Sequence, residues 1–299
     1  MDFLAALCQS NPTLGNLERN FESHHQWLDR ALEAKADLVL FPELSLTGYM
    51  LKDLTQDVAM GLEDPRVQDL VARSSDCSLV FGMVEESRDH QFFNSMVFAE
   101  GGRILHVHRK VHLPDYGIFE EGRYFASGTS FEKISSRLGD LGLMICEDAW
   151  HPTSAWLHFL QGVQVLMVPS TSPARGVDTD AAELASQRMW RVLLSAHSIQ
   201  HQCWSLYCNR VGFEDGAMYW GGSLVISPFG HPLAEAEGEV ESLLLHRIES
   251  DPVRRARIFT PLLRDSHPDL VRRQLARILD DRDALQAQRN EENDREQIR

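Results

Sequence analysis

The sequence predicts a layered α/β fold with mixed β-sheets, followed by a helical C-terminal extension. Short apolar runs with the character of buried strands alternate with helical patterns, which is typical of α/β proteins. Pairs of strand-like runs joined by turn residues interrupt the alternation, so antiparallel hairpins are expected as well. The composition changes from Pro252 onward. We therefore expect one domain over residues 1–251 and an extension over residues 252–299.

The first half of the chain begins with a strand, a helix and a second strand. Phe3–Gln9 is an apolar run, and Asn16 is placed to cap a helix over Leu17–Ala34. The continuous apolar run Ala36–Phe41 predicts a strand buried on both faces, and Leu44–Tyr49 predicts a loop. The elements predicted after these are the helix Pro65–Ser75 and the strands Ser78–Val84, Asn94–Ala99 and Arg103–His108.

The second half repeats this pattern and ends in a helix. Gly139-Asp140 joins two strand-like runs, and Phe229-Gly230 joins two more. These strands are predicted over Phe131–Leu138, Leu141–Ile145, Ser223–Ser227 and Glu241–Arg247. The other elements predicted here are the strands Val163–Pro169 and Cys203–Cys208 and the helices Pro152–Gln161, Thr179–Gln200 and Asp265–Ala284. The polar stretch Gln286–Arg299 is expected to be loosely ordered.

Charge and composition exclude several classes of protein. The 299-residue chain has a net charge of −15, and an acidic surface disfavours nucleic acids and anionic membranes as partners. The five cysteines are widely spaced without a CxxC pair, so neither a disulfide framework nor a cysteine-based zinc site is predicted. The N-terminus lacks the pattern of a secretory signal, and no apolar run approaches the length of a membrane span. We expect a cytoplasmic protein.

The stretch Leu141–Pro152 carries the strongest local signal for chemistry. Its apolar run ends abruptly at Cys146, and the polar residues Glu147 and Asp148 precede a helical pattern. A cysteine between a buried strand and a helix N-terminus meets partial positive charge, which favours the reactive thiolate. The structural alternative is a buried cysteine that packs as a small hydrophobic residue.

Three polar residues stand at the ends of predicted strands: Glu43, Lys110 and Cys146. Strand ends on one side of a sheet are where α/β enzymes place their chemistry. A carboxylate can take the proton of a thiol, and an ammonium can stabilise the negative charge that develops on an attacked carbonyl or nitrile. A Cys–His–Asp arrangement with His151 or His197 is the alternative, and it leaves Glu43 and Lys110 without a role.

A cluster of histidines raises the question of a metal site. His106, His108 and His112 lie close together in the sequence, and the first two share one face of a strand. Lys110 shares that face, and its charge would repel a cation. We therefore predict no metal site.

Three sequence blocks resemble the signatures of the nitrilase, or carbon–nitrogen hydrolase, superfamily. They are FPELSLTGY, RKVHLPDYGIFEEGRYFASG and LGLMICEDAW, and the resemblance runs from about Phe3 to about His246. It implies a four-layer αββα sandwich with two mixed β-sheets. It also implies a hydrolase that forms a cysteine thioester, releases ammonia or an amine, and needs no metal or organic cofactor.

The resemblance assigns catalytic roles to residues of these blocks. Glu43 would be the general base, Cys146 the nucleophile, and Lys110 the group that stabilises the tetrahedral intermediate. The family also has a second glutamate in the loop after the lysine. Glu121 matches it, and the neighbouring Glu120 is the alternative.

Within the superfamily, the sequence looks most like the glutaminase domain of glutamine-dependent NAD synthetases. Tyrosines at the positions of Tyr49 and Tyr116 contact the substrate there, so both are predicted to bind substrate. Ser172 is a further candidate for binding, and the backbone N–H of Glu147 would complete the oxyanion hole. Two departures leave glutamine open as the substrate. No SGGxDS-type ATP-binding loop occurs, and ARGVDTD follows the STSP stretch.

The resemblance therefore predicts hydrolysis of a small primary amide, glutamine-like or another ω-amide. A nitrile or an N-carbamoyl amine could be attacked by the same Glu–Lys–Cys set. An interpretation from another class is an ammonia-supplying subunit of a separate ATP-dependent synthetase. The superfamily also implies a homodimer or a higher homo-oligomer, to which the apolar side of Leu270–Leu279 could contribute.

Overall fold

The computed structural model describes residues 2–175 and 184–297, with side chains as far as residue 283. The chain divides into two compact units, Met1–Thr260 and Pro261–Arg299. The first unit holds the sheets and includes α7 (Ser250–Phe259), whose Arg257 donates a hydrogen bond to the Val163 carbonyl oxygen (2.7 Å). Among the residues described, no helix combines the length and apolarity needed to cross a membrane.

One six-stranded mixed sheet comes mainly from the N-terminal half of the chain. Its strands lie in the order β14-β1-β2-β3-β4-β5. β1, β2 and β3 are parallel, whereas β4, β5 and β14 each pair antiparallel. The strands are β1 (Asp2–Gln9), β2 (Leu38–Leu40), β3 (Ser78–Glu86), β4 (Phe92–Glu100), β5 (Arg103–Arg109) and β14 (Ser242–Glu249).

A second six-stranded sheet has the order β13-β12-β9-β8-β7-β6. Its central strands β7, β8 and β9 are parallel, and the outer strands pair antiparallel. A separate hairpin joins β10 and β11. These strands are β6 (Ile134–Ser136), β7 (Gly139–Leu143), β8 (Val165–Ser170), β9 (Trp204–Asn209), β10 (Val211–Glu214), β11 (Ala217–Trp220), β12 (Leu224–Ile226) and β13 (Pro232–Glu235).

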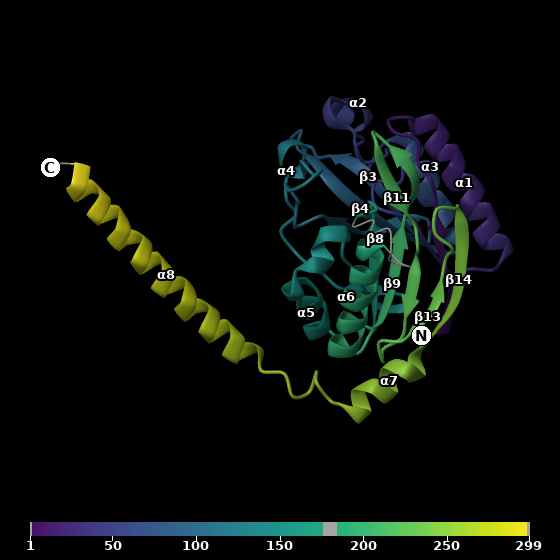
Figure 1. The fold of residues 1–299 in the computed structure, drawn as a ribbon. Helices are drawn as coiled ribbons and strands as arrows, with labels where there is room; N and C mark the ends of the chain where they lie inside the picture. Colours follow the sequence, from purple (N-terminus) through teal and green to yellow (C-terminus); the bar gives the residue numbers. More distant parts are fainter. Residues whose placement is uncertain (1, 176–183, 298–299) are drawn as a thin grey trace. The chain divides into compact units, whose positions relative to one another are not determined.

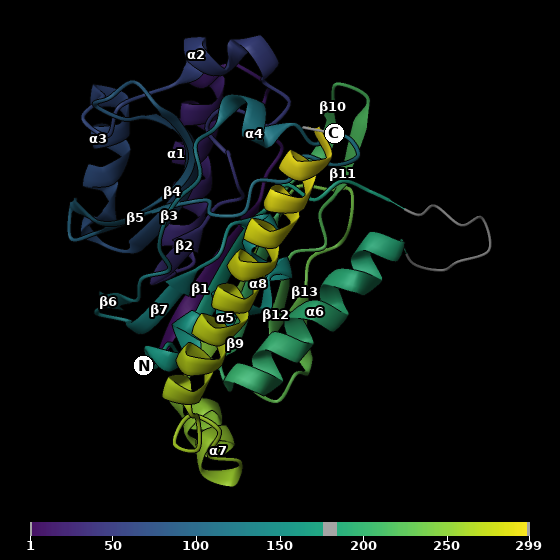
Figure 2. The same ribbon diagram turned by 90° about the vertical axis from the view of Figure 1, so that its left-hand side faces the viewer.

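The two sheets pack face to face, and helices cover their outer faces. α1 and α3 lie on the first sheet, and α5 and α6 lie on the second (Figures 1 and 2). Side chains along β1 point alternately to the two faces of the sheet, and both faces are buried. Ala5 and Leu7 join the core between the sheets, while Ala6 and Cys8 join the core beneath α1. The αββα sandwich is confirmed. Its covering helices are α1 (Leu17–Glu33), α3 (Pro65–Ala72), α5 (Pro152–Leu160) and α6 (Ala185–His201).

The predicted pairing of the last two strands is wrong. β12 pairs with β13 after the turn at Phe229-Gly230, and β14 pairs with β1 in the other sheet. β13 is an edge strand with mostly exposed side chains, so its sequence lacks the apolar pattern from which a strand can be predicted. The chain therefore crosses from one sheet to the other between β13 and β14, and the first and last strands of the sandwich lie side by side.

The two C-terminal helices also differ from their predicted bounds. α6 confirms the helix predicted from Thr179, although residues 176–183 lie outside the described part of the chain. α8 (Pro268–Gln297) forms the second unit and remains helical where loose order was predicted. The stretch is rich in glutamate, glutamine and arginine, and these residues have a high helix propensity.

The strand directions bring the candidate residues to one edge of the sandwich. β5 runs parallel to β2 because β4 lies antiparallel to both β3 and β5. Glu43 therefore follows β2 at the same edge where Lys110 follows β5. In the other sheet, Cys146 follows β7, and Ser170 ends the neighbouring parallel strand β8.

Candidate active site

A buried lysine connects the two predicted catalytic glutamates. Lys110 lies directly after β5 and is 1% exposed. Its Nζ donates hydrogen bonds to Glu43 Oε1 (2.7 Å) and to Glu121 Oε1 (2.6 Å). An ammonium buried with two carboxylates is held in one orientation, because each charge depends on the others for compensation.

Glu43 is fixed by groups from both sheets. Asn94 Nδ2 on β4 donates to Glu43 Oε1 (2.8 Å), and the Thr171 backbone N–H donates to Glu43 Oε2 (2.8 Å). Gly82 on β3 lets the turn that carries Glu43 pack directly on the strand, since a Cβ there would clash with the Leu44 backbone nitrogen. The carboxylate therefore cannot swing away from the lysine.

Cys146 lies in a strained turn beside Glu43. It begins a single 3₁₀ turn, Cys146–Trp150, with φ at +43°, a region that non-glycine residues rarely occupy. Ser170 Oγ donates to the Cys146 sulfur (3.1 Å). The next residue, Thr171, holds Glu43, so the end of β8 places the thiol and the carboxylate side by side.

The ionisation of Cys146 differs from the sequence-based expectation of a thiolate. Burial, together with the charge on Glu43, raises the pKa of this thiol above its ordinary value, although Lys110 and the Ser170 hydroxyl oppose the rise. The helix that follows Cys146 is a single turn, so its dipole is small. The resting group is therefore a thiol, and its use as a nucleophile requires a base.

The charges of the other two groups depend on one another. Burial lowers the pKa of the Lys110 ammonium, but the charges of Glu121 and Glu43 outweigh this effect, and the pKa stands well above its ordinary value. Burial raises the pKa of Glu121 to about 7, with Lys110 opposing the rise and Glu43 adding to it. Lys110 is thus a permanent cation, whereas Glu121 titrates near neutral pH.

This shift predicts a pH dependence of stability. The folded-state pKa of Glu121, about 7, lies above the ordinary value of 4.5, so folding favours the protonated carboxyl. The stabilising contribution is complete below the ordinary value and is lost as the pH rises through the folded value. The free energy of urea unfolding should fall more steeply between about pH 5 and about pH 8 in the wild type than in Glu121→Gln. Equal slopes in the two proteins would show that Glu121 is not the group responsible.

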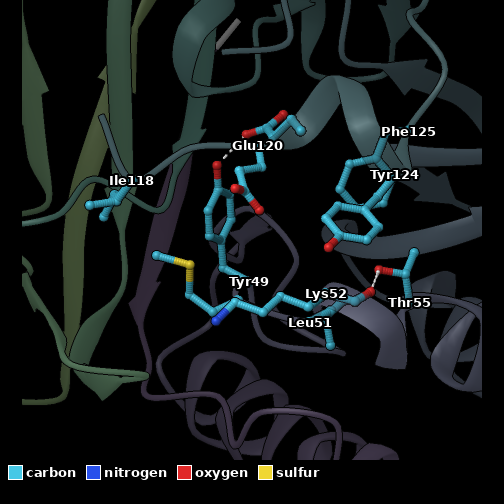
Figure 3. A pocket seen from close by; sticks show the side chains of 10 residues that line it. Tyr49, Leu51, Lys52, Thr55, Ile118, Glu120, Tyr124 and Phe125 are labelled. Atoms are coloured by element: carbon cyan, nitrogen blue, oxygen red, sulfur yellow. Dashed lines mark hydrogen bonds between the residues drawn. The ribbon is translucent and has the colours of Figure 1, made fainter. Parts of the chain in front are cut away.

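The structure separates Glu121 from its neighbour Glu120. Glu121 begins α4 (Glu121–Tyr124) and is 3% exposed, whereas Glu120 is exposed. The Tyr49 hydroxyl donates to Glu121 Oε1, the oxygen that also accepts from Lys110. Tyr49 and Glu121 line a small pocket of about 40 Å³ together with Glu120 and Thr55, the first residue of α2 (Thr55–Val58). Figure 3 shows Tyr49, Glu120 and Thr55 in the lining of this pocket. Tyr49 thus contacts Glu121 in this structure, and its role in substrate binding stays a prediction.

Cys146 opens into a larger pocket of about 210 Å³. Its described walls are mostly apolar and aromatic, and two charged side chains interrupt them. Tyr116 is half exposed, and its hydroxyl donates to Glu147 Oε2 (2.8 Å). The Arg175 guanidinium lies over the rings of Phe119 (4.7 Å) and Tyr116 (5.8 Å). The walls include Phe119, Trp150, Pro173, Ala185, Met189 and Trp190.

Ser172 lies in the wall of this pocket and has protein partners for its side chain and its backbone, and its role in substrate binding stays a prediction. Its hydroxyl accepts a hydrogen bond from Trp190 Nε1 (2.8 Å), and its backbone N–H donates to Asn209 Oδ1 (2.9 Å). Ser172 therefore connects α6, which carries Trp190, to the end of β9, which carries Asn209.

Histidines near the site make other contacts. His197 Nε2 bonds the Ala149 carbonyl oxygen (2.6 Å), and the His151 ring stacks on His112 with 3.5 Å between centroids. Within residues 2–175 and 184–297, no hydrogen bond joins Cys146 to a histidine. In the same part of the chain, no group of three or more histidine, cysteine, aspartate or glutamate side chains is arranged to hold a metal ion.

Sequence reasoning missed three residues that shape this site: Asn94, Ser170 and Thr171. All three are buried, and their roles depend on partners far away in the sequence. The one available signal was the stretch VPSTSP, which contains Ser170 and Thr171 and belongs to the resemblance described above. Within this stretch, the resemblance points only to Ser172 as a candidate.

Comparison with known sequences matches most of the chain to one family. A profile described as carbon–nitrogen hydrolase matches residues 4–258. The glutamine-dependent NAD(+) synthetase of Thermotoga maritima is 30% identical over 262 residues, which cover 85% of this chain and 43% of that protein. The N-carbamoylputrescine amidase of Arabidopsis thaliana is 26% identical over 261 residues, covering 82% of this chain and 86% of that protein. The chain thus spans less than half the length of the synthetase.

A solved structure of the amidase from Nesterenkonia sp. AN1 has the same fold. It superposes with a TM-score of 0.75 at 25% identity and covers 91% of this chain and 99% of the amidase chain. That structure is a glutamate-to-glutamine variant that shows Michael addition of acrylamide at its active-site cysteine.

Proposed function

Because the chain belongs to the carbon–nitrogen hydrolase family, we propose that it hydrolyses a small primary amide through a thioester on Cys146 and releases ammonia. The observation that carries this proposal is the buried Lys110 ammonium, which bridges Glu43 and Glu121 beside a thiol that is protonated at rest. A nucleophile, a base and a fixed cation are the three groups that acyl transfer to sulfur requires.

The first half of the reaction forms the thioester. Glu43 takes the proton of the Cys146 thiol as the sulfur attacks the amide carbonyl carbon. The carbonyl oxygen becomes an oxyanion, which the Lys110 ammonium and the Glu147 backbone N–H stabilise. The carbon–nitrogen bond then breaks, and Glu43 returns its proton to the leaving nitrogen, so that ammonia departs and the acyl group stays on sulfur.

The second half uses the same groups with water. Glu43 takes a proton from a water molecule, whose oxygen attacks the thioester carbonyl, and the oxyanion forms again beside Lys110. The carbon–sulfur bond breaks, the acid leaves, and the proton returns to Cys146. Glu121 keeps Lys110 in place throughout by accepting its hydrogen bond, and Tyr49 donates to the same Glu121 oxygen.

The pocket supports a substrate with a charged head group. Glu147 carries a carboxylate and Arg175 a guanidinium, and both contact Tyr116 at the pocket that begins at Cys146. An α-amino acid head has an ammonium for the first and a carboxylate for the second. An ω-amide of the L-glutamine type would then extend its amide toward the sulfur along the apolar walls.

Removal of Arg175 tests the assignment of the head group. Arg175→Ala should raise KM for L-glutamine about tenfold and leave kcat within about twofold, because the guanidinium binds a part of the substrate that does not react. Arg66→Ala is the matched control, since Arg66 is an exposed arginine on α3 that pairs with Asp64, the N-cap residue of this helix. An unchanged KM in the Arg175 variant would remove this residue from substrate recognition.

Ammonia release by purified protein tests the function as a whole. We expect steady release from L-glutamine that disappears in Cys146→Ala. Release from an N-carbamoyl amine instead would support the activity named for the Arabidopsis relative, and turnover of a nitrile would support the nitrilase alternative. Release that requires an added ATP-dependent synthetase would support the subunit interpretation. A protein that turns over none of these compounds, alone or with a synthetase, would contradict the proposal.

A further inference from the structure

A fully buried aspartate connects the segments that carry Lys110 and Cys146. Asp148 is 0% exposed and lies two residues after the cysteine. Its carboxylate accepts four hydrogen bonds, three from backbone N–H groups and one from a histidine ring. A buried carboxylate with every donor supplied by the protein fixes the segments that provide those donors.

Three of the four contacts come from residues that flank Lys110. Oδ1 accepts from the backbone N–H groups of Val111 (3.1 Å) and His112 (2.9 Å), the two residues that follow the lysine. Oδ2 bonds His108 Nε2 (3.0 Å), two residues before the lysine at the end of β5. The strand end that aims Lys110 is thus held on both sides.

The fourth contact closes the turn that carries the nucleophile. Oδ2 also accepts from the backbone N–H of Ile145 (3.0 Å), the residue before Cys146. The side chain therefore returns to the start of its own turn and encloses Cys146, whose φ of +43° needs such support. Lys110 lies at the edge of the first sheet and Cys146 at the edge of the second sheet, so the Asp148 carboxylate connects the two sheets at the site.

We propose that Asp148 is a positioning residue that holds Lys110 and the Cys146 thiol in their reactive arrangement, with His108 as its partner. The inference rests on the proposed function, because it concerns the groups that carry out that reaction. Asp148 acts through its neighbours and does not contact substrate. Despite burial, which raises it, the pKa of this carboxyl stays below its ordinary value because His108 and the backbone donors favour the anion.

An amide cannot replace this carboxylate. Asparagine has a single acceptor oxygen, so in Asp148→Asn the NH₂ group must face either the two donors beside Lys110 or the Ile145 N–H. Because two donors repel each other, either the segment after Lys110 or the turn at Ile145 is then displaced. A matched control is Glu100→Gln at the far end of β4, where a carboxylate likewise accepts from three donors: Ser78 Oγ (2.6 Å), Ser136 Oγ (2.6 Å) and the Arg137 N–H (3.2 Å).

The kinetic test compares these two variants. Asp148→Asn should lower kcat about 100-fold and leave KM within about threefold, because the groups that stabilise the transition state move while the pocket remains. Glu100→Gln should keep kcat within about twofold, even if its melting temperature falls as far as that of Asp148→Asn. His108→Phe keeps a planar aromatic ring at this position and removes one donor, so it should fold and lose about tenfold in kcat. Wild-type kcat in His108→Phe and Asp148→Asn would overturn the inference.

A second readout needs no substrate and separates this inference from the proposed function. We would follow alkylation of Cys146 by iodoacetamide against pH, with peptide mapping to distinguish it from the other buried cysteines. A loosened turn exposes the thiol, so alkylation in Asp148→Asn should level off near the ordinary thiol pKa of 9.0, whereas the wild-type rate should still rise there. Glu100→Gln should follow the wild type. Identical profiles in all three proteins would overturn the positioning role, whatever the substrate proves to be.

Discussion

Replacing Cys146 by alanine is expected to abolish turnover and leave the fold intact. The thiol supplies the electron pair that forms the thioester, and no other side chain in the described pocket lining is a cysteine. Turnover should fall at least about 10⁴-fold, as for other enzymes that lose a nucleophile. The substitution removes one sulfur, whose hydrogen-bond partner is Ser170, so the free energy of unfolding should change by only about 1 kcal/mol.

The matched control is Cys203→Ala. Cys203 is equally free and 1% exposed, but it lies in the hydrophobic core before β9. Ammonia release should persist in this variant, while circular dichroism and thermal unfolding should show both variants folded. A Cys146→Ala protein with wild-type turnover would end the thioester mechanism.

Replacing Lys110 by alanine is expected to remove both activity and stability. Without the ammonium, the oxyanion loses its fixed positive partner, and kcat/KM should fall at least about 10³-fold. Glu43 and Glu121 also lose the cation that compensates them in a buried site, which should cost about 3–5 kcal/mol of unfolding free energy. Few single substitutions in this chain should affect both quantities so strongly.

The pH dependence of this variant separates charge from packing. Because the pKa of Glu121 stands at about 7 in the wild type, this carboxyl is largely protonated at about pH 5 and needs less compensation there. The stability lost in Lys110→Ala should therefore be smaller at about pH 5 than at about pH 8. Lys133→Ala, which removes a partly exposed lysine paired with Asp140 (3.2 Å), should cost less than about 1 kcal/mol at either pH. An equal loss for both lysines would contradict the buried charge network.

The fold class and the positions of Glu43, Lys110 and Cys146 could be predicted because each depends on local sequence. A buried strand can be recognised in the sequence as an apolar run, and a polar residue at its end can be identified without knowing the tertiary structure. The shared edge then follows from parallel strand direction. The choice between Glu120 and Glu121 could not be made in this way. It depends on which side chain α4 turns inward, and the structure buries Glu121.

Other parts of the site depend on contacts that no local pattern encodes. Asn94 lies inside a strand that looks ordinary, yet it meets Glu43 across the sheet. Ser170 and Thr171 act on residues from two different sheets. The ionisation of Cys146 was misjudged for a related reason, since a helix terminus can be read from sequence whereas the depth of burial and a neighbouring carboxylate cannot. The pairing of β14 with β1 likewise joins opposite ends of the first unit.

The central claim is that the acyl group of the substrate passes through a covalent bond to Cys146. The most direct test is to mix the protein with L-glutamine, or with the amide it turns over fastest, quench with acid during turnover, and map peptides by mass spectrometry. We predict that the peptide containing Cys146 gains the mass of one acyl group, that the adduct disappears when substrate is exhausted, and that it accumulates when hydrolysis is slowed. Ammonia release with no adduct on Cys146, or with an adduct on another residue, would contradict this account.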